Sequence, residues 1–409
     1  VVATLLDLAT GAPAAVASML NLQQPYGADV ISRISAAMLD PAALDRLRDA
    51  ARDTLARLTG EVCARAGVAR EEVYEIALAG NATMVHLALG IDPEPLGVAP
   101  FVMAARSFPE LLAGDLGVPV HPRARAVVLP ALGAYVGGDI VAGALAAGMD
   151  RDRRLRLLID VGTNCEIVLG DADRLLATAA PAGPAFEGAQ IRCGMRAAPG
   201  AIETVRIDPA AGRVALGVIG DAAPAGLCGS GLVDAVAELR RTGLVDASGR
   251  LADADAARRV APALAERLAT IGGERVFLLT DPDAAEPVYL SQRDIRELQF
   301  AKGAIATGWR LLLEEYGAAE SDIRQVLLAG SFGSYLSPAS AIRIGLVPRL
   351  APARIVSAGN VAGEGAKLAL LSAQERAGAL ALLEEVRYVE LSDRPDFNDR
   401  FVGELAFPG

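Results

Sequence analysis

Two segments that lie far apart in the chain follow the same pattern, and this repetition limits the fold more than any other feature. Residues 75–81 read Glu-Ile-Ala-Leu-Ala-Gly-Asn, and residues 325–331 read Gln-Val-Leu-Leu-Ala-Gly-Ser. Each is an apolar run of strand length that is broken by glycine and followed by a helical pattern. Duplicated lobes usually place a shared ligand in the cleft between them. The repetition therefore predicts an α/β protein of two related lobes.

Other segments extend this pattern. Residues 134–148 and 357–373 are both rich in Gly and Ala with helical spacing. Their small side chains would let two backbones pack closely, as in crossing helices at an interlobe hinge. Residues 154–170 read as two apolar strands around a polar turn, and residues 1–11 resemble only the second of these strands.

Two long helices are expected between these landmarks. One covers residues 26–66 and the other residues 291–316. Ser291 and Asp294 form a capping box for the second helix. Its apolar face is expected to consist of Ile295, Leu298, Ile305, Trp309 and Leu312.

Length, charge and hydropathy exclude several classes of protein. A chain of 409 residues with 52% hydrophobic and 22% charged content can build two or three cored domains. The net charge of -11, without a basic stripe, argues against nucleic acid and anionic membrane surfaces as partners. The most apolar stretch, residues 127–149, contains Pro130, Asp139 and several glycines, so we interpret it as a buried helix and not a membrane span.

Cysteine usage points to a reducing compartment. The four cysteines lack the paired spacing of a zinc or iron–sulfur site, and no signal peptide is visible. A cytoplasmic location is therefore expected. The two histidines, His86 and His121, have no metal-ligand spacing and receive no role.

The sharpest local motif is Asp160-Val161-Gly162-Thr163-Asn164, at the turn between two predicted strands. Gly162 would let backbone amides approach a phosphate, and Thr163 or Asn164 could donate hydrogen bonds. Asp160 could hold Mg²⁺ through water. An ordinary hairpin turn would use the same residue types, so this assignment depends on companion motifs.

Two companion motifs carry glycines at the end of a strand or the start of a helix. Residues 228–231, Cys-Gly-Ser-Gly, would place an anion at a helix N-terminus, although a simple helix start has the same composition. Residues 328–333, Leu-Ala-Gly-Ser-Phe-Gly, would let a flat ring lie against the backbone, although a plain exit from a strand is the alternative.

A further glycine-bearing segment, residues 182–188, places Glu187 in an apolar loop. That carboxylate could orient water, contact a metal or contact a partner, and a surface charge is the ordinary alternative. The chain has no Gly-x-x-x-x-Gly-Lys-Ser/Thr loop and no convincing Ser-His-Asp set. The common P-loop NTPase and serine hydrolase classes are therefore excluded.

Together, these segments resemble the superfamily of acetate and sugar kinases, heat-shock chaperones and actin (ASKHA), whose two ribonuclease H-like lobes clamp ATP. Residues 160–164 are similar to the phosphate loop of the second lobe, residues 328–333 to the adenosine motif, and residues 357–366 to the second interlobe helix. The resemblance implies a nucleotide cleft between the lobes. It implies a first lobe over residues 1–150, a second over 151–372 and a C-terminal segment over 373–409 that packs back on the lobes.

A closer resemblance covers nearly the whole chain. The chain is identified as a member of the reductive activators of corrinoid-dependent methyltransferases. The motifs that carry this similarity are residues 26–34, 79–84, 135–140, 182–188, 194–197, 228–232 and 294–305.

This resemblance implies a cofactor set and a partner. An N-terminal plant-type iron–sulfur domain would pass an electron to the cobalt of a corrinoid protein or methyltransferase, while ATP and Mg²⁺ bind the lobes. The sequence itself has no cluster ligands, and the family's Asp-Ile-Gly-Thr-Thr phosphate turn would come just before Val1. We therefore expect the first lobe to lack its first strand and phosphate turn, and ATP hydrolysis by this segment alone to be weak or absent.

The resemblance also assigns residues and leaves alternatives open. The intact protein would be an ATPase coupled to corrinoid reduction, with a small-molecule kinase or a non-enzymatic docking module as the alternatives. The oligomeric state is left open, a homodimer included. Phosphate and magnesium are assigned to Asp160, Gly162, Thr163 and Asn164, and cofactor binding at the helix N-terminus to Gly229, Ser230 and Gly231. The adenosine is assigned to Gly330, Ser331 and Gly333, and its ribose or base to Lys302. The partner is assigned to Gly183, Glu187, Gly188, Met195 and Arg196.

Overall fold

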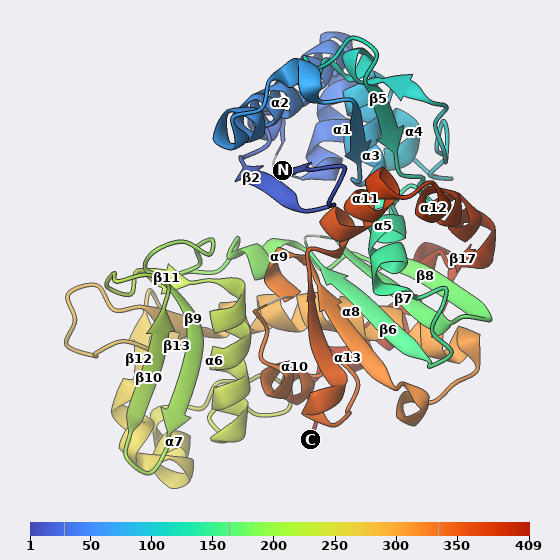
Figure 1. Cartoon of the computed structure of the whole chain (residues 1–409). Helices are drawn as coiled ribbons and strands as arrows, with labels where there is room; N and C mark the ends of the chain where they lie inside the picture. The colour runs from blue at the N-terminus through green and yellow to red at the C-terminus, as the bar shows by residue number, and fades with distance from the viewer. Residues whose placement is uncertain (28, 163, 334) are drawn as a thin grey trace. The chain divides into compact units, whose positions relative to one another are not determined.

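The computed structural model describes residues 1–27, 29–162, 164–333 and 335–409, and the side chain of Ser331 is outside this description. The chain forms two compact units. Helices and strands alternate in both (Figure 1), which confirms the predicted α/β class. The first unit consists of Val1–Asp152, Ala172–Leu175 and Asn360–Tyr388, and the second of Arg153–Asp171, Leu176–Gly359 and Val389–Gly409.

The first unit contains two small sheets. In one, β1 (Val2–Leu6) pairs antiparallel with β2 (Pro13–Ser18). In the other, β5 (Arg125–Val128) pairs parallel with β3 (Glu75–Leu78) and antiparallel with β4 (Leu111–Leu112). The short strand β17 (Val386–Tyr388) also belongs to this unit.

The first unit contains more helical than strand residues. They are α1 (Val30–Leu39), α2 (Pro41–Ala66), α3 (Ala82–Leu89), α4 (Glu94–Gly97), α5 (Gly138–Ala147), α11 (Val361–Leu371) and α12 (Ala373–Glu385). The single helix predicted over residues 26–66 is wrong, because α1 ends and α2 begins at Asp40. The Asp40 carboxylate accepts a hydrogen bond from the amide of Ala42, and Pro41 has no amide proton with which to continue α1.

The two Gly/Ala-rich segments pack against each other as predicted. They form α5 and α11, which both belong to the first unit. At their closest approach, a Cβ atom on Gly365 would lie 2.0 Å from the carbonyl oxygen of Ala142. Only glycine allows this approach. The hinge role of these helices stays a prediction.

The main sheet of the second unit has β15 (Gln325–Ala329) between two parallel neighbours, β6 (Arg156–Val161) and β16 (Ile355–Gly359). The antiparallel strand β7 (Cys165–Asp171) and then β8 (Arg174–Ala180) follow β6. Two three-stranded sheets complete the unit. They are built from β9 (Ala201–Asp208), β10 (Arg213–Val218) and β11 (Gly226–Leu227), and from β12 (Leu268–Ile271), β13 (Glu274–Leu278) and β14 (Tyr289–Ser291).

The predicted helix over residues 291–316 is confirmed as α8 (Gln292–Tyr316). The hydroxyl of Ser291 accepts a hydrogen bond from the amide of Asp294, and the Asp294 carboxylate accepts one from the amide of Ser291. The predicted apolar face is buried. The other helices of this unit are α6 (Gly229–Arg241), α7 (Ala254–Val260), α9 (Gly330–Gly333), α10 (Pro338–Ile344) and α13 (Phe397–Glu404).

The repeated segments have the same local structure in both units. Helices α2 and α8 each end at a left-handed glycine, Gly67 and Gly317. A short 3₁₀ turn follows each glycine, and a carboxylate, Glu72 or Asp322, accepts a backbone amide three residues earlier at 2.9 Å. The turn leads into β3 in one unit and β15 in the other. The repetition seen in the sequence therefore reflects a repeated helix–turn–strand unit.

The compact units group the C-terminal residues differently from the predicted ranges. Residues 360–372 were expected in the second lobe, but α11 and α12 pack on α5 and so belong to the first unit. The first boundary lies after Asp152, two residues beyond residue 150. In the part of the chain that the structure describes, no helix combines the length and apolar character needed to cross a bilayer.

Candidate functional site

The motif at residues 160–164 lies at the hairpin between β6 and β7. The register pairs Asp160 with Glu166 on β7 and with Ala329 on β15. Gly162 and Asn164 belong to the connection, and Thr163 lies outside the described residues. Because β6 and β15 are parallel, Asp160 and the glycines after Ala329 share the carboxyl edge of the sheet, where ligands of α/β proteins bind.

Gly330 contacts the Asp160 carboxylate directly. Its backbone has φ +86°, a conformation that favours glycine. A Cβ atom at Gly330 would lie 2.6 Å from Oδ1 of Asp160 and 2.8 Å from the carbonyl oxygen of Val161. The predicted phosphate and adenosine motifs are therefore adjacent. They lie so close that any side chain at position 330 would clash with Asp160 and Val161.

The Asp160 carboxylate is held in an unfavourable setting for a charge. Burial raises its pKa from 3.8 to about 6. Among the described residues, no Lys or Arg forms an ion pair with it. A carboxylate that needs a compensating cation fits the oxygen-rich chemistry of Mg²⁺.

The Cys228–Gly231 motif forms the N-terminus of α6, as predicted. A Cβ atom on Gly229 would lie 2.1 Å from the carbonyl oxygen of Phe186, and one on Gly231 would lie 2.1 Å from the carbonyl oxygen of Ile202. Both glycines are thus required by close packing. The Ser230 hydroxyl lies 3.3 Å from the sulfur of Cys228.

A cavity of about 690 Å³ joins these motifs within the second unit. This volume is typical of pockets for small ligands and cofactors. The predicted nucleotide residues that line it are Gly162, Gly229 and Ser230. The predicted partner residues Glu187, Met195 and Arg196 line the same cavity. Its remaining lining residues are Val161, Phe186, Ala197, Glu203, Val218, Ile219, Gly220, Cys228, Phe332 and Tyr335.

The loop with the predicted partner residues is fixed from two sides. Gly183 and Gly188 take positive φ values of 74° and 78° at the ends of a short turn. The amide of Met195 donates to the carbonyl oxygen of Leu227 on β11 at 2.9 Å. The amide of Arg192 donates to Asp294 at the start of α8 at 2.8 Å. Burial raises the pKa of Asp294, which nonetheless holds both the helix cap and this loop.

The cavity is also lined by an aromatic pair, which sequence reasoning did not find. The rings of Phe186 and Phe332 stack with their centroids 4.8 Å apart. Phe186 belongs to the glycine-bearing loop and Phe332 to the predicted adenosine motif. Nothing in the local pattern of either segment indicates that the two rings meet, because the contact depends on the tertiary fold.

Lys302 lies on α8 and does not line this cavity. Its ammonium donates to the carbonyl oxygen of Ala406 at 2.5 Å and lies 5.5 Å from the ring centre of Phe407. Burial lowers its pKa from 10.5 to about 8. Contact with a nucleotide stays a prediction, and the structure gives this ammonium a partner in the C-terminal segment.

We expect Lys302→Met to stabilise the protein at pH 7 by about 1 kcal/mol. The shift of the Lys302 pKa from 10.5 to about 8 means that the buried charge costs about 3 kcal/mol of stability, at about 1.4 kcal/mol per pH unit, and the variant removes this cost. The variant also loses a hydrogen bond that stabilises the fold by about 1 to 2 kcal/mol. Because the folded pKa of Lys302 lies below the unfolded value, wild-type stability should rise between about pH 8 and 10.5. Urea unfolding at pH 7 and 10 measures both effects, and the variant should lack this rise. Reduced ATP affinity in the variant would instead support the predicted nucleotide contact.

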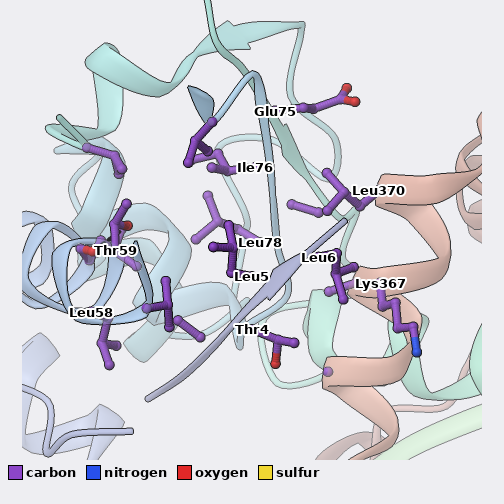
Figure 2. Close-up of a pocket in the computed structure, with 18 of the residues that line it drawn as sticks. Thr4, Leu5, Leu6, Leu58, Thr59, Glu75, Ile76, Leu78, Lys367 and Leu370 are labelled. Atoms are coloured by element: carbon purple, nitrogen blue, oxygen red, sulfur yellow. Dashed lines mark hydrogen bonds between the residues drawn. The ribbon is translucent and has the colours of Figure 1, made fainter. Parts of the chain in front are cut away.

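The first unit has its own cavity, of about 220 Å³, between β1 and β3 (Figure 2). Leu5, Leu6, Ile76 and Leu78 give it an apolar lining, and Lys367 of α11 lies at its side. Within the described ladders, β1 pairs only with β2 and β3 only with β5. None of the predicted site residues lines this cavity.

The fold and the site define a two-unit α/β protein with a cavity of ligand size beside the glycine motifs of its second unit. Residues 154–409 match the family model described as the C-terminal domain of RACo, the ASKHA domain. Residues 1–152 match the model of the RACo middle region. The chain therefore belongs to the RACo family. Its ASKHA domain is of a class that binds nucleotides.

Similar proteins were found among curated proteins and solved structures. The chain is 37% identical over 412 residues to "Corrinoid activation enzyme RamQ" of Eubacterium limosum, with 100% of this chain and 68% of that protein covered. It is 25% identical over 337 residues to "[Co(II) methylated amine-specific corrinoid protein] reductase" of Methanosarcina barkeri, with 76% and 56% covered. A solved structure described as "Reductive activator for corrinoid,iron-sulfur protein" matches with a TM-score of 0.87 and 36% identity, over 100% of this chain and 64% of that one. The chain thus spans between 56% and 68% of the length of these relatives.

Proposed function

We propose that this chain is the ATP-binding core of a reductive activator that helps return cobalt(II) corrinoid to the cobalt(I) state. One observation carries the proposal. In a member of the RACo family, two glycine motifs meet at one edge of the main sheet beside the partly buried Asp160 carboxylate, and a third, at the start of α6, lies against Phe332 at a cavity of about 690 Å³. The names of the relatives, a corrinoid activation enzyme and a corrinoid protein reductase, supply the reaction class.

Different residues near the cavity would bind Mg²⁺, the phosphates and the adenosine. Asp160 would hold the metal through water, and Gly162, Thr163 and Asn164 would offer donors to the phosphates. The N-terminus of α6 at Gly229–Gly231 favours negative charge through its free amides. Gly330, Ser331 and Gly333 would lie beside the adenosine, and bound Mg²⁺ would neutralise phosphate charge.

The electron donor and the corrinoid partner would not belong to the residues described here. Reduction of cobalt(II) to cobalt(I) takes one electron, which an iron–sulfur cluster in another domain would supply. A nucleotide bound in the cavity of the second unit would favour one form of the protein, and that form would dock the corrinoid protein or methyltransferase. The protein would act in the cytoplasm, and a homodimer is compatible with this scheme.

The decisive experiment mixes the intact activator, with its iron–sulfur domain reduced, with a cobalt(II) corrinoid protein. The corrinoid absorption spectrum is followed with and without MgATP. An ATP-dependent cobalt(I) spectrum supports the proposal. Phosphoryl transfer to a small acceptor without cobalt reduction would favour the kinase alternative. The absence of any heat on adding MgATP in calorimetry would favour a docking module.

Glu187→Gln separates the predicted partner role from nucleotide binding. Glu187 is exposed and lines the cavity from the glycine-bearing loop, whereas Glu203 lines it from β9. We expect Glu187→Gln to slow corrinoid activation by about tenfold, the loss expected for one charge-assisted hydrogen bond, with ATP affinity unchanged. Glu203→Gln is the matched control and should leave activation intact. Equal losses of ATP affinity and activation in Glu187→Gln would move this residue to the nucleotide site.

A further inference from the structure

The predicted adenosine motif meets the large cavity of the second unit through the ring of Phe332. Phe332 lines that cavity, whereas Gly330 and Gly333 of the same motif do not. A Cβ atom on Gly330 would lie 2.6 Å from Oδ1 of Asp160, and one on Gly333 would lie 3.2 Å from the carbonyl carbon of Leu328. Both glycines therefore pack inward. Among the described side chains of this motif, Phe332 is the one that a ligand in the cavity can reach.

The Phe332 ring is held in place by two neighbours. Phe186 stacks on it, with the ring centroids 4.8 Å apart and an angle of 26° between the ring planes. Phe186 is itself 3% exposed and belongs to the main hydrophobic core of the unit. The backbone of Gly229 packs against the ring, since a Cβ atom there would lie 2.3 Å from Cε2 and 2.7 Å from Cδ2 of Phe332. A ring that is fixed in this way loses little freedom when a flat ligand stacks on it.

The second aromatic side chain at this end of the cavity has less support. Tyr335 also lines the cavity, but it is 67% exposed. Among the described residues, no aromatic ring stacks on Tyr335. Ordering an exposed tyrosine costs side-chain entropy that Phe332 has already lost in packing. Phe332 is therefore the better stacking surface of the two.

The cavity combines this ring with groups that suit phosphates. Gly229 and Ser230, at the N-terminus of α6, line the same cavity. Because Gly229 contacts the Phe332 ring and also begins α6, the aromatic surface and the end of the helix that favours anions are adjacent. Val218 and Ile219 add apolar lining. A nucleotide joins a flat aromatic base to phosphates and so fits this combination.

We propose that the base of the bound nucleotide stacks on the face of the Phe332 ring that Phe186 leaves open. This inference rests on the proposed function, and it makes Phe332 the residue that distinguishes a nucleotide from a sugar phosphate. Stacking between a base and an aromatic side chain strengthens binding by roughly 5- to 150-fold. The sequence pattern places the flat ring against the glycine backbone of the motif instead. The two models differ in the group that contacts the base.

The test measures the binding of two ligands to the intact activator by calorimetry. They are MgATP and the magnesium complex of ribose 5-triphosphate, which lacks only the base. We expect the wild type to bind MgATP more tightly by about tenfold or more, because only MgATP can stack. Phe332→Leu should weaken MgATP binding by about tenfold and leave the binding of ribose 5-triphosphate unchanged. Phe332→Tyr keeps the aromatic face and should bind MgATP as the wild type does.

The matched control removes a stacked ring outside the cavity. Phe300 is 50% exposed, stacks on Phe401 and does not line the cavity. Phe300→Leu should therefore bind both ligands like the wild type. If Phe332→Leu does not fold, Phe332→Met takes its place, because methionine fills a similar volume without an aromatic face.

The outcomes separate this inference from the proposed function. Equal affinity of the wild type for the two ligands would overturn the stacking of the base and leave nucleotide binding through the phosphates intact. If neither ligand binds, the proposed function fails and the stacking fails with it. The inference is also overturned if the folded Phe332 variant without a ring keeps the MgATP affinity of the wild type. A loss of MgATP affinity in Tyr335→Leu alone would place the base on that ring instead.

Discussion

Gly365→Ala is expected to destabilise the first unit by about 3 kcal/mol or more. The new Cβ atom would lie 2.0 Å from the carbonyl oxygen of Ala142, 2.4 Å from its carbonyl carbon and 2.6 Å from its Cα atom. All three are backbone atoms of α5, so no side-chain rotation can make room, and the two helices must separate. Forced overpacking of this kind costs about 1 to 3 kcal/mol in cores with mobile side chains, and more against a rigid backbone. Urea unfolding followed by circular dichroism measures the loss.

Gly378→Ala is the matched control for this prediction. Gly378 lies inside α12, where the nearest atom to a new Cβ is Cδ1 of Leu145 at 3.6 Å, an ordinary contact. Alanine is the better helix former by about 1 kcal/mol, so this variant should be as stable as the wild type or more stable. If Gly365→Ala unfolds at the same urea concentration as Gly378→Ala, the close approach of α5 and α11 is wrong.

The parts of the fold that the sequence predicts are those set by local backbone preferences. The Gly/Ala pattern indicates α5 and α11 because small side chains are needed wherever backbones meet. The capping box at Ser291 and Asp294 sets the start of α8. The break at Asp40 also has a local cause, a capping Asp followed by Pro, but the longer apolar periodicity on both sides hides it.

The features of the site also fall into those that local sequence predicts and those that it does not. Glycine corners at strand ends and at the start of α6 are visible because the backbone there needs residues without side chains. The stacking of Phe186 on Phe332 depends on distant segments, so no spacing rule finds it. Lys302 looks like a solvated or ligand-binding side chain in the sequence, whereas its burial against Phe407 is decided by the docking of the C-terminal segment.

Asp160→Asn is expected to stabilise the ligand-free protein above pH 6 by up to about 3 kcal/mol. Burial raises the pKa of Asp160 from 3.8 to about 6, so the unfolded chain releases this proton at a lower pH than the folded protein does. Stability therefore falls as pH rises from 3.8 to 6 and stays lower above this range. The gap between the two pKa values corresponds to about 3 kcal/mol at about 1.4 kcal/mol per pH unit. An amide carries no charge, so the variant should lack this fall.

The same substitution should weaken stabilisation by MgATP, because an amide cannot offer the negative charge that the metal compensates. Thermal unfolding between pH 4 and 8, with and without MgATP, measures both effects. Asp208→Asn is a control of opposite sign, because the amides of Ala211 and Ala210 lower the pKa of that exposed carboxyl. A variant at Asp160 that gains stability in the absence of ligand but responds fully to MgATP would separate the two roles. The carboxylate would then be a partly buried structural acid, and the metal would have to be held by the phosphates and by residues of the cavity.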